Sequence, residues 1–445
     1  MKISIIGLGK LGAPMAAVMA HKGNTVVGVD VNPAYVAAIQ NALPPVNEPG
    51  LADLITANRE RLSATEDYQA AILATDVTFI IVPTPSDPDG RFSMRYVLSA
   101  AEKIGAALRK KESWHLVVLS STVMPGSTGG ELLPALEAAS GKKCGPDFGL
   151  CYNPEFIALG TVIRDMLRPD MILIGESEER GGKLLEQLYT GVCDSNPKIQ
   201  RMSYVNAELT KISVNTFVTT KISYANMLAQ VCETLPGADV DVVTAALGCD
   251  TRIGPKYLKG ALGYGGPCFP RDNVAFSAMA RGNGVPALLA EATDATNRNQ
   301  VPRLAALIRS RLPEGGTAAV LGLSYKPQTE VIDESQGVAL ARELSKAGVK
   351  VVVYDPAAMD NARKALGASV AFAESAAACA GAADVIAIMT PWAHFKQLTA
   401  GDVKDGAVVV DCWRMFGPEH FGGGVERLWL GFGLDSLTIV ATCSQ

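Results

Sequence analysis

The chain has 445 residues, of which 48% are hydrophobic and 19% charged, and its formal net charge at pH 7 is −5. This length exceeds what one hydrophobic core usually supports, so we expect two or three domains. Basic residues are outnumbered and form no long run, which argues against a nucleic-acid-binding protein. No apolar run approaches the roughly 20 residues that span a bilayer, and no signal-peptide pattern is found. We therefore expect a cytoplasmic protein without membrane contact.

The cysteines give no sign of a disulfide framework. There are nine of them, an odd number, and none forms a CxxC pair or a spacing typical of metal ligands. We expect reduced thiols, mostly small buried side chains, and no metal site. The nine are Cys144, Cys151, Cys193, Cys232, Cys249, Cys268, Cys379, Cys412 and Cys443.

The first 200 residues alternate short β-rich runs with alanine-rich helical stretches. Alternation of this kind predicts an α/β domain with a parallel sheet covered on both faces. The segment 193–197 (Cys-Asp-Ser-Asn-Pro) is a break that marks the end of this domain, which we place at residues 1–200. The predicted strands are Ile3–Ile6, Thr25–Val29, Val77–Val82, Leu116–Ser120 and Met171–Gly175.

One long helix is predicted from Ser203 to Leu235, because this stretch contains no helix-breaking residue. Its apolar residues occupy more than one face, so we expect it to be buried on several sides. Pro236-Gly237 ends it, and Asp239 is placed to cap the next helix. We assign residues 201–300 to a central helical domain in which this connector also forms a homodimer interface.

A second alternating pattern begins at Gly316 and predicts a smaller domain, residues 301–445. The fold class is therefore α/β, with two doubly wound Rossmann-like domains joined by a long central helix. The glycine-rich stretch 417–445 gives no clear pattern. The predicted strands are Ala318–Leu323, Val349–Tyr354, Asp384–Met389 and Ala407–Val410.

A dinucleotide fingerprint follows the first strand directly. The stretch Gly7-Leu8-Gly9-Lys10-Leu11-Gly12 opens a helix, where glycines let the backbone approach a pyrophosphate and unpaired N–H groups favour anions. The second strand ends in Asp30, whose carboxylate would accept hydrogen bonds from the adenosine ribose and repel a 2′-phosphate. The alternative is that Asp30 only caps the next turn. Together these features predict NAD as cofactor, bound by Gly7, Gly9, Lys10, Leu11, Gly12 and Asp30.

The stretch 263–272 (Gly-Tyr-Gly-Gly-Pro-Cys-Phe-Pro-Arg-Asp) holds three glycines within four residues, followed by Cys268. Glycines at this density predict a tight loop that approaches something closely. Cys268 with Asp272 four residues later fits a nucleophile and a general base. Taken alone, a buried structural cysteine would be the commoner interpretation.

Further motifs occur in a fixed order along nearly the whole chain. These motifs are Asn47-Glu48-Pro49-Gly50-Leu51, Ser121-Thr122-Val123-Met124-Pro125-Gly126, Asn153-Pro154-Glu155-Phe156, Ala207-Glu208-Leu209-Thr210-Lys211 with Asn215, the Cys268 loop, Gly322-Leu323-Ser324-Tyr325-Lys326-Pro327 and Val353-Tyr354-Asp355-Pro356. On these motifs and the dinucleotide fingerprint, the protein resembles the nucleotide-sugar dehydrogenases.

The resemblance implies a set of catalytic residues. Oxidation of a primary alcohol to an acid removes two hydrides, and a Cys268 thiolate can carry the aldehyde as a thiohemiacetal and then a thioester. Water activated by Asp272 or by the Glu155 neighbourhood would release the carboxylate. Lys211 and Asn215, four apart on a helix, can together stabilise the oxyanion. The implied catalytic residues are Thr122, Glu155, Lys211, Asn215, Cys268 and Asp272, and Thr122 is also implied to contact the NAD cofactor.

Substrate-binding residues are also implied. Arg252 lies where the family uses an arginine, often in a neighbouring subunit's site, although an ordinary surface charge is the alternative. Likewise Lys211 alone would fit a solvated helix charge. Cationic side chains suit a diphosphate. The implied substrate-binding residues are Glu155, Phe156, Ile157, Lys211, Asn215, Arg252, Tyr257, Lys259, Tyr264, Gly265 and Lys326.

The chain departs from the family pattern at several positions. Leu159 replaces an acidic residue that usually faces the cofactor, and Asp333 replaces an arginine near the NAD pyrophosphate. Pro267 and Arg271 stand where serine and lysine are usual, and Arg414 is one residue out of step in the late Asp-x-Arg motif. These changes leave the chemistry intact and bear on the choice of sugar nucleotide.

We expect NAD-dependent oxidation of the C6 alcohol of a nucleotide sugar, with UDP-glucose favoured over GDP-mannose or a UDP-N-acetylhexosamine. One alternative is a two-electron β-hydroxyacid dehydrogenase, which needs neither the thiol nor the second Rossmann-like domain. Another is a nucleotide-sugar-binding protein without activity.

Overall fold

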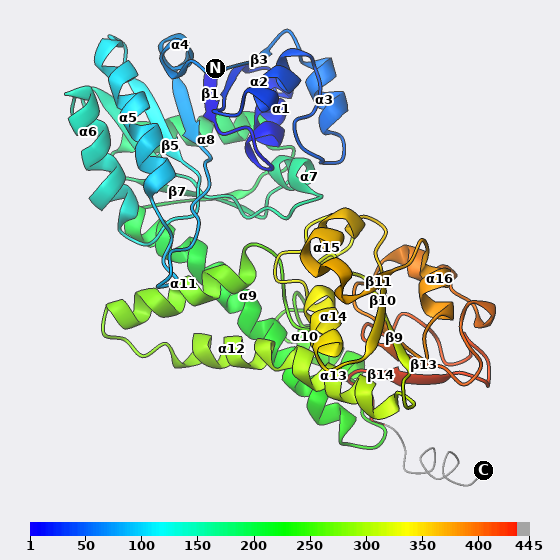
Figure 1. Cartoon of the computed structure of the whole chain (residues 1–445). Helices are drawn as coiled ribbons and strands as arrows, with labels where there is room; N and C mark the ends of the chain where they lie inside the picture. Colours follow the sequence, from blue (N-terminus) through cyan, green and yellow to red (C-terminus); the bar gives the residue numbers. More distant parts are fainter. Residues whose placement is uncertain (434–445) are drawn as a thin grey trace. The chain divides into compact units, whose positions relative to one another are not determined.

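The computed structural model describes residues 1–433, and the chain divides into two compact units, Met1–Ser213 and Val214–Gln445. Each unit is built around its own sheet (Figure 1). Among the described residues no helix is both long and apolar enough to cross a membrane. No disulfide joins any of the described cysteines.

The first unit contains an eight-stranded sheet in the order β3-β2-β1-β4-β5-β6-β7-β8. The first six strands give the order 3-2-1-4-5-6 of doubly wound dinucleotide-binding folds. All neighbouring strands are parallel except β6 and β7, which pair antiparallel. The strands are β1 (Lys2–Ile6), β2 (Thr25–Val29), β3 (Leu62–Thr65), β4 (Val77–Ile80), β5 (His115–Leu119), β6 (Phe148–Tyr152), β7 (Met171–Glu176) and β8 (Lys198–Met202).

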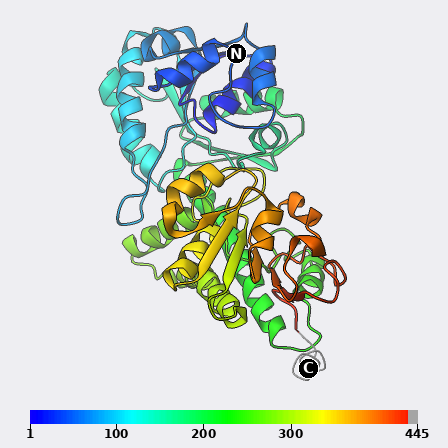
Figure 2. The same ribbon diagram turned by 45° about the vertical axis from the view of Figure 1, so that its right-hand side comes forward.

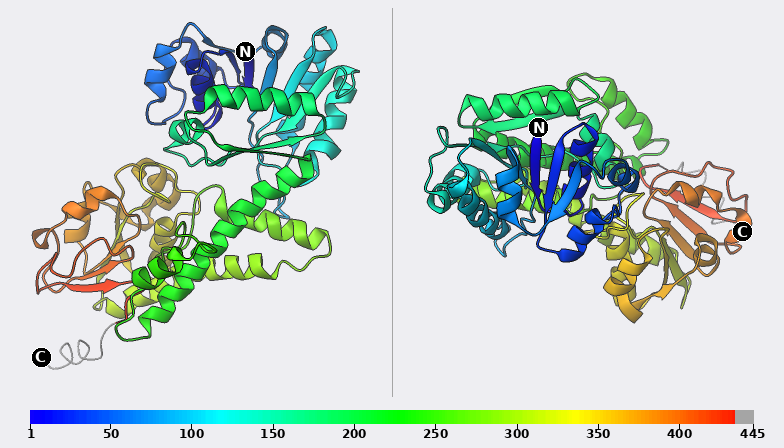
Figure 3. Two further views of the ribbon diagram at one scale, coloured as in Figure 1. Left: turned by 180° about the vertical axis from the view of Figure 1, so that it is seen from behind. Right: turned by 90° about the horizontal axis from the view of Figure 1, so that it is seen from above.

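Helices cover both faces of this sheet (Figure 3, right). Successive side chains of a strand point to opposite faces, so Leu116 and Val118 of β5 enter one core while Val117 and Leu119 enter the other. The helices are α1 (Gly12–His21), α2 (Pro33–Gln40), α3 (Leu51–Ala57), α4 (Tyr68–Ala74), α5 (Arg95–Lys110), α6 (Leu133–Ser140), α7 (Val162–Leu167) and α8 (Glu179–Val192).

The five predicted strands of this unit are present, with ends that shift by one or two residues. The prediction missed β3, β6 and β8. The break at 193–197 does not end the sheet, because β8 pairs with β7 beyond it. As an edge strand, β8 carries Lys198, Gln200 and Arg201, so it lacks the apolar run that reveals a central strand.

The long helix α9 spans Tyr204–Glu233, close to the predicted range (Figure 3, left). Within the single chain the helix is buried on several sides, but one stripe is exposed. Phe217, Tyr224, Met227 and Val231 are all exposed, with Phe217 at 66%. Their spacing of seven, three and four residues places them on one face of the helix. The prediction that Asp239 caps the following helix is confirmed, since its side chain accepts a hydrogen bond from the Asp241 amide.

The second unit contains a six-stranded parallel sheet in the order β11-β10-β9-β12-β13-β14, which repeats the doubly wound order. The yellow strands of this sheet lie side by side in Figure 2. The fold class predicted from the sequence is confirmed. The unpredicted strands are β11 and β14, and β14 lies in the stretch 417–445 that gave no pattern. Residues 434–445 of that stretch lie outside the described part of the chain. The strands are β9 (Thr317–Leu321), β10 (Lys350–Tyr354), β11 (Ala371–Phe372), β12 (Val385–Ile388), β13 (Val408–Asp411) and β14 (Glu426–Trp429).

The helices of the second unit fall into two groups. Among the described residues, four precede the first strand of the sheet along the chain and three lie between its strands. The first four are α10 (Val240–Cys249), α11 (Phe269–Gly282), α12 (Leu288–Arg298) and α13 (Gln300–Arg311), and the other three are α14 (Gln336–Lys346), α15 (Met359–Leu366) and α16 (Ala376–Gly381).

Candidate active site

The three glycines of the fingerprint serve different purposes. Gly7 has φ of +101°, and a Cβ there would lie 2.2 Å from the Ile81 carbonyl oxygen. A Cβ on Gly12 would lie 1.8 Å from the Gly7 carbonyl oxygen. Gly9, in contrast, has no heavy atom within 4 Å of its Cβ position. Packing therefore requires the outer glycines, while the middle one leaves room for a ligand to approach the backbone.

Lys10 and Leu11 lead into α1, whose N-terminus follows this open position. Lys10 is exposed and Leu11 is half-buried. Unpaired N–H groups at the start of a helix favour a phosphate. These residues fit the pyrophosphate of a dinucleotide.

Asp30 follows β2 and is fixed by two backbone bonds. Its Oδ2 accepts from the Leu8 amide at 2.6 Å, and its Oδ1 accepts from the Asn32 amide at 2.8 Å. Each carboxylate oxygen can accept a further hydrogen bond, so ribose hydroxyls fit here. The interpretation of Asp30 as only a turn cap is too narrow, because the residue also holds the glycine loop.

Asp30 should make the protein strongly selective for NAD over NADP, because a 2′-phosphate would meet its carboxylate. We expect Asp30→Asn to reduce the ratio of the two kcat/KM values by about tenfold, the size of a modest charge repulsion. Steady-state kinetics with both cofactors measures this ratio, and Asp53→Asn on the exposed surface of α3 is the matched control. Equal efficiencies in the unaltered protein would contradict the role of Asp30.

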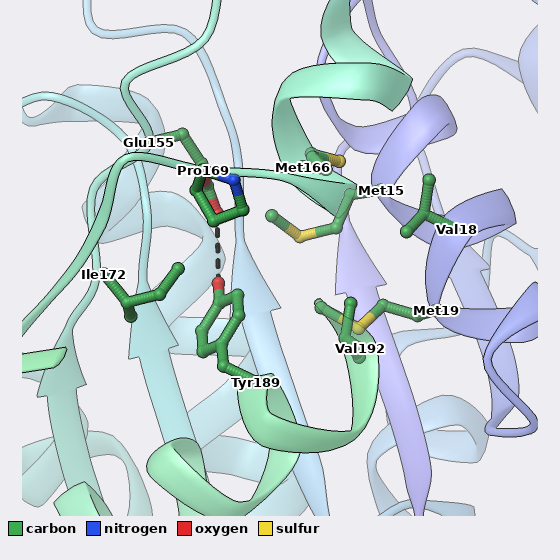
Figure 4. Close-up of a pocket in the computed structure, with 9 residues that line it drawn as sticks. All are labelled: Met15, Val18, Met19, Glu155, Met166, Pro169, Ile172, Tyr189 and Val192. Atoms are coloured by element: carbon green, nitrogen blue, oxygen red, sulfur yellow. Dashed lines mark hydrogen bonds between the residues drawn. The ribbon is translucent and has the colours of Figure 1, made fainter. Parts of the chain in front are cut away.

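Glu155 lies in the loop after β6 and its carboxyl enters an apolar environment. The Tyr189 hydroxyl lies 3.0 Å from Glu155 Oε1, and burial raises the pKa of Glu155 to about 7, against the opposing effects of Tyr189 and Lys211. Figure 4 shows the Glu155 carboxyl and the Tyr189 hydroxyl facing each other at a small cavity. The cavity is lined by Met15, Val18, Met19, Glu155, Met166, Pro169, Ile172, Tyr189 and Val192.

Lys211, near the start of α9, is not a solvated helix charge. It is 8% exposed, and its Nζ donates to the Glu155 carbonyl oxygen at 2.6 Å. The same Nζ lies 4.6 Å from the centroid of the Phe156 ring. The structure thus brings together Glu155, Phe156 and Lys211, three of the residues predicted to form the site.

Two buried glutamates, whose roles the sequence did not reveal, fix the neighbouring loops. Glu208 is fully buried and accepts from the Gly126 and Thr128 amides at 2.6 and 2.7 Å. It thereby anchors the turn after Thr122, which is half-buried and whose carbonyl oxygen accepts from Thr84 Oγ1 at 2.7 Å.

Glu48 fixes the loop that carries Glu155 and Ile157. It accepts from the Gly160 and Val162 amides at 2.9 and 2.7 Å. Glu48 and Glu208 both lie in motifs noted in the sequence. A charged residue in each motif was the only sequence feature that could have indicated these anchoring roles.

In the second unit, Cys268 is exposed and immediately precedes α11. The loop before it needs its glycines. A Cβ on Gly265 would lie 2.4 Å from the Glu334 carbonyl oxygen, and one on Gly266 would lie 2.6 Å from the Tyr325 ring. Close packing on the segment 325–334 therefore explains why the loop contains these glycines. Because Cys268 is exposed, the alternative of a buried structural cysteine is wrong.

Asp272 lies one turn into α11 and is 1% exposed. Its Oδ2 accepts from Asn215 Nδ2 at 2.6 Å, and Arg271 Nε lies 3.6 Å from its Oδ1. The structure thus brings together Asn215 and Asp272 of the predicted catalytic residues. This hydrogen bond fixes the orientation of the Asn215 amide, because only its Nδ2 can donate to the Asp272 carboxylate.

Two buried asparagines, also unpredicted, hold the loop that leads to Cys268. Asn226 of α9 donates to the Leu262 carbonyl oxygen at 2.8 Å and accepts from the Ala261 amide at 2.9 Å. Asn297 of α12 makes the equivalent pair with Tyr264, at 3.1 and 2.7 Å. Each amide side chain thus pairs with a backbone carbonyl oxygen and a backbone N–H of the loop, as a neighbouring β-strand would. For Asn226 the only signal in the sequence was a polar residue between apolar neighbours, and the largely polar sequence of α12 gave no signal for Asn297.

The remaining predicted substrate-binding residues are spread over the surface of this unit. Arg252 is exposed and pairs with Asp250 at 2.6 Å. Tyr257 is 51% exposed with φ of +64°, a strained conformation for a bulky residue. Lys259 is exposed and Lys326 is half-buried, 5.8 Å from the Tyr325 ring.

Tyr264 is the predicted contact least available to a ligand. It is 5% exposed, and its ring lies 6.4 Å from that of Phe269. Gly265, the next residue, is half-buried.

The departures from the family pattern have local explanations. Leu159 packs against the hydrophobic core of the first unit. Asp333 is exposed, and its carbonyl oxygen accepts from the Gly266 amide at 2.9 Å. Arg414, out of step in the sequence, has φ of +55° and pairs with Asp241 at 2.7 Å. It thereby ties the end of β13 to the start of α10.

A dinucleotide cradle in one unit and an exposed thiol beside a glycine-rich loop in the other are the features of a dinucleotide-dependent dehydrogenase. Comparison with known families agrees. The UDP-glucose/GDP-mannose dehydrogenase family matches residues 1–193 with its NAD binding domain, 205–299 with its central domain and 319–418 with its UDP binding domain.

Individual relatives agree with these matches. The UDP-glucose 6-dehydrogenase AglM of Haloferax volcanii is 39% identical over 402 residues, 89% of this chain and 93% of that protein. The GDP-mannose 6-dehydrogenase of Pseudomonas aeruginosa is 34% identical over 359 residues, 80% of this chain and 81% of that protein. The solved UDP-glucose dehydrogenase of Pyrobaculum islandicum aligns with a TM-score of 0.88 and 36% identity, covering 97% of this chain and 98% of that one.

The chain therefore belongs to the UDP-glucose/GDP-mannose dehydrogenase family. The predicted family is confirmed, and so is NAD as cofactor.

Proposed function

We propose that this nucleotide-sugar dehydrogenase oxidises the C6 alcohol of its substrate to a carboxylate, and that the substrate is UDP-glucose. The observation that carries the four-electron reaction is the exposed Cys268 in its closely packed glycine loop. UDP-glucose is favoured because relatives named for it reach 39% identity, against 34% for those named for GDP-mannose. GDP-mannose is the second candidate.

Four electrons leave as two hydrides, and two NAD molecules accept them. The balance is one alcohol, two NAD⁺ and one water giving one carboxylate, two NADH and three protons. After the first hydride transfer, the Cys268 thiolate adds to the aldehyde carbon and forms a thiohemiacetal. Loss of the second hydride gives a thioester, and water then breaks its C–S bond and returns the thiolate.

Three residues around this chemistry have separate tasks. Lys211 and Asn215 lie four residues apart on α9 and donate to the oxygen that becomes negative when the thiolate or water adds. Asp272 orients Asn215 through their 2.6 Å hydrogen bond. Glu155, whose pKa burial raises to about 7, suits proton transfer at neutral pH and takes the proton of the attacking water.

The remaining predicted residues would hold the ligands. Thr122 and the fingerprint residues serve NAD. Phe156, Ile157, Tyr257, Tyr264 and Gly265 would contact the nucleotide and sugar. Arg252, Lys259 and Lys326 supply the positive charge that a diphosphate requires.

A panel of sugar nucleotides, with NADH counted per substrate consumed, tests the proposal. We expect two NADH per molecule, with the highest kcat/KM for UDP-glucose. One NADH would indicate a two-electron dehydrogenase, and none would indicate a binding protein. A preference for GDP-mannose or a UDP-N-acetylhexosamine would leave the chemistry intact and change the substrate.

We also expect a homodimer built on α9. Its exposed residues Phe217, Tyr224, Met227 and Val231 form one apolar stripe, and such stripes mark interfaces, unlike apolar residues scattered singly over a surface. Phe217→Glu should shift the dimer to monomer by placing a charge in an apolar interface. Light scattering at micromolar concentration measures this. A stable monomer in the unaltered protein would contradict the expectation and remove the case for Arg252 serving a neighbouring subunit.

A further inference from the structure

A hydrogen-bonded chain of buried side chains leads to Glu155. Asn153, at the end of β6, is 1% exposed, and its Nδ2 donates to the Leu173 carbonyl oxygen at 2.9 Å. Because a carbonyl oxygen only accepts, this bond fixes the orientation of the amide. Asn153 Oδ1 therefore faces the Tyr189 hydroxyl, 2.5 Å away.

The Tyr189 hydroxyl has one proton but two oxygen neighbours. One is Asn153 Oδ1 at 2.5 Å, and the other is Glu155 Oε1 at 3.0 Å. Asn153 Oδ1 is only an acceptor and is the nearer of the two, so the tyrosine proton goes to it. The tyrosine oxygen is then left as an acceptor, and its contact with Glu155 requires a proton on the carboxyl group.

We propose that Asn153 is a positioning residue: by accepting the Tyr189 proton it withholds that donor from Glu155 and so keeps Glu155 protonated in the resting protein. This inference rests on the proposed function, in which Glu155 transfers a proton. In each turnover the Glu155 proton first leaves to solvent, and Tyr189 turns its own proton toward the carboxylate that remains. The Glu155 carboxylate then takes a proton from the water that attacks the thioester, so the acid forms again and donates to the tyrosine oxygen.

The surroundings of Glu155 support the acid form. The cavity residues supplied by α1 and α7 are apolar, namely Met15, Val18, Met19 and Met166. The titratable or charged groups that face Glu155 are Tyr189 from α8, Cys193 just after α8 and Lys211 from α9. The lysine ammonium is bonded to the Glu155 main-chain carbonyl oxygen. Burial consequently raises the pKa of Glu155 from 4.5 to about 7.

Infrared difference spectroscopy tests the inference without relying on turnover. The carboxylic acid band that disappears in Glu155→Gln belongs to this residue, and its titration gives the midpoint. We expect a midpoint near pH 7 in the unaltered protein. Tyr189→Phe should raise it by about one pH unit, because the ionised carboxylate loses a charge-assisted donor.

Asn153→Leu should move the midpoint in the opposite direction. Without the competing amide oxygen, the Tyr189 proton is free to stabilise the carboxylate. Tyr204→Phe is the matched control, since its buried hydroxyl contacts Leu150 and Ser177 but not Glu155. If Asn153→Leu fails to fold, the comparison of Tyr189→Phe with Tyr204→Phe still decides the question.

Thermal unfolding supplies a second measurement. The folded-state pKa of Glu155 is raised, so its contribution to stability is complete below about pH 4.5 and is lost as the pH rises through about 7. Glu155→Gln lacks this dependence. The unaltered protein should therefore lose stability relative to the variant across this window.

The outcomes separate the inference from the proposed function. A midpoint near 4.5, or one that Tyr189→Phe leaves unchanged, would overturn the inference. In support, the pH profile of kcat should move with the infrared midpoint in Tyr189→Phe while KM stays constant; a profile that does not move would overturn the positioning role. Full activity of Glu155→Gln would instead refute the catalytic task given to Glu155, even with the expected infrared shifts.

Discussion

Cys268→Ser should reduce kcat by about three orders of magnitude or more and change the affinities for NAD and sugar nucleotide only a few fold. A serine oxygen is a weak nucleophile without strong activation, and an alkoxide is a poorer leaving group from an ester than a thiolate is from a thioester. The side chain is exposed and precedes α11, so the substitution should not disturb packing. The loss should therefore appear in the chemical steps.

Stopped-flow measurement of NADH and intact-mass spectrometry check this result. An ester that forms slowly and hydrolyses slowly would appear as an added mass of the acyl group. Cys249→Ser is the matched control, because Cys249 is also exposed but ends α10. Unaltered turnover in Cys268→Ser would remove the covalent mechanism and leave Cys268 as a loop residue.

Lys211→Ala should lower kcat on the order of a hundredfold or more, with a smaller effect on KM. The ammonium is buried and directed by its bond to the Glu155 carbonyl oxygen, so no solvent cation can easily replace it. Both the thiolate addition and the hydrolysis create negative charge on the substrate oxygen. Loss of the cation should thus slow each of them.

Single-turnover kinetics of the second hydride transfer, which follows thiolate addition, and of carboxylate release measures the effect of Lys211→Ala. Lys183→Ala is the control, because Lys183 forms an exposed pair with Glu179 on α8. Thermal unfolding of each variant separates lost packing from lost chemistry. A large rise in KM with kcat unchanged would make Lys211 a binding residue instead.

Local patterns in the sequence were enough to predict the two doubly wound domains, the long helix and the NAD site. Alternating strands and helices, and glycines directly after a strand, depend on neighbours within a few residues. The edge strand β8 escaped because its polar residues break the pattern. The resemblance that the motifs carried also pointed to Cys268, Lys211 and Asn215, because each lies in a short recognisable stretch.

Only the tertiary structure decided which partners these residues have. Asn215 and Asp272 are separated by 57 residues, and Tyr189 and Glu155 by 34, so no local pattern connects them. Their hydrogen bonds arise because strands and helices distant in sequence pack side by side and exclude water. Burial raises the pKa of Glu155, while the packing of the chain leaves one face of α9 exposed. Both effects depend on the surroundings of a side chain in space and not on its neighbours in the sequence.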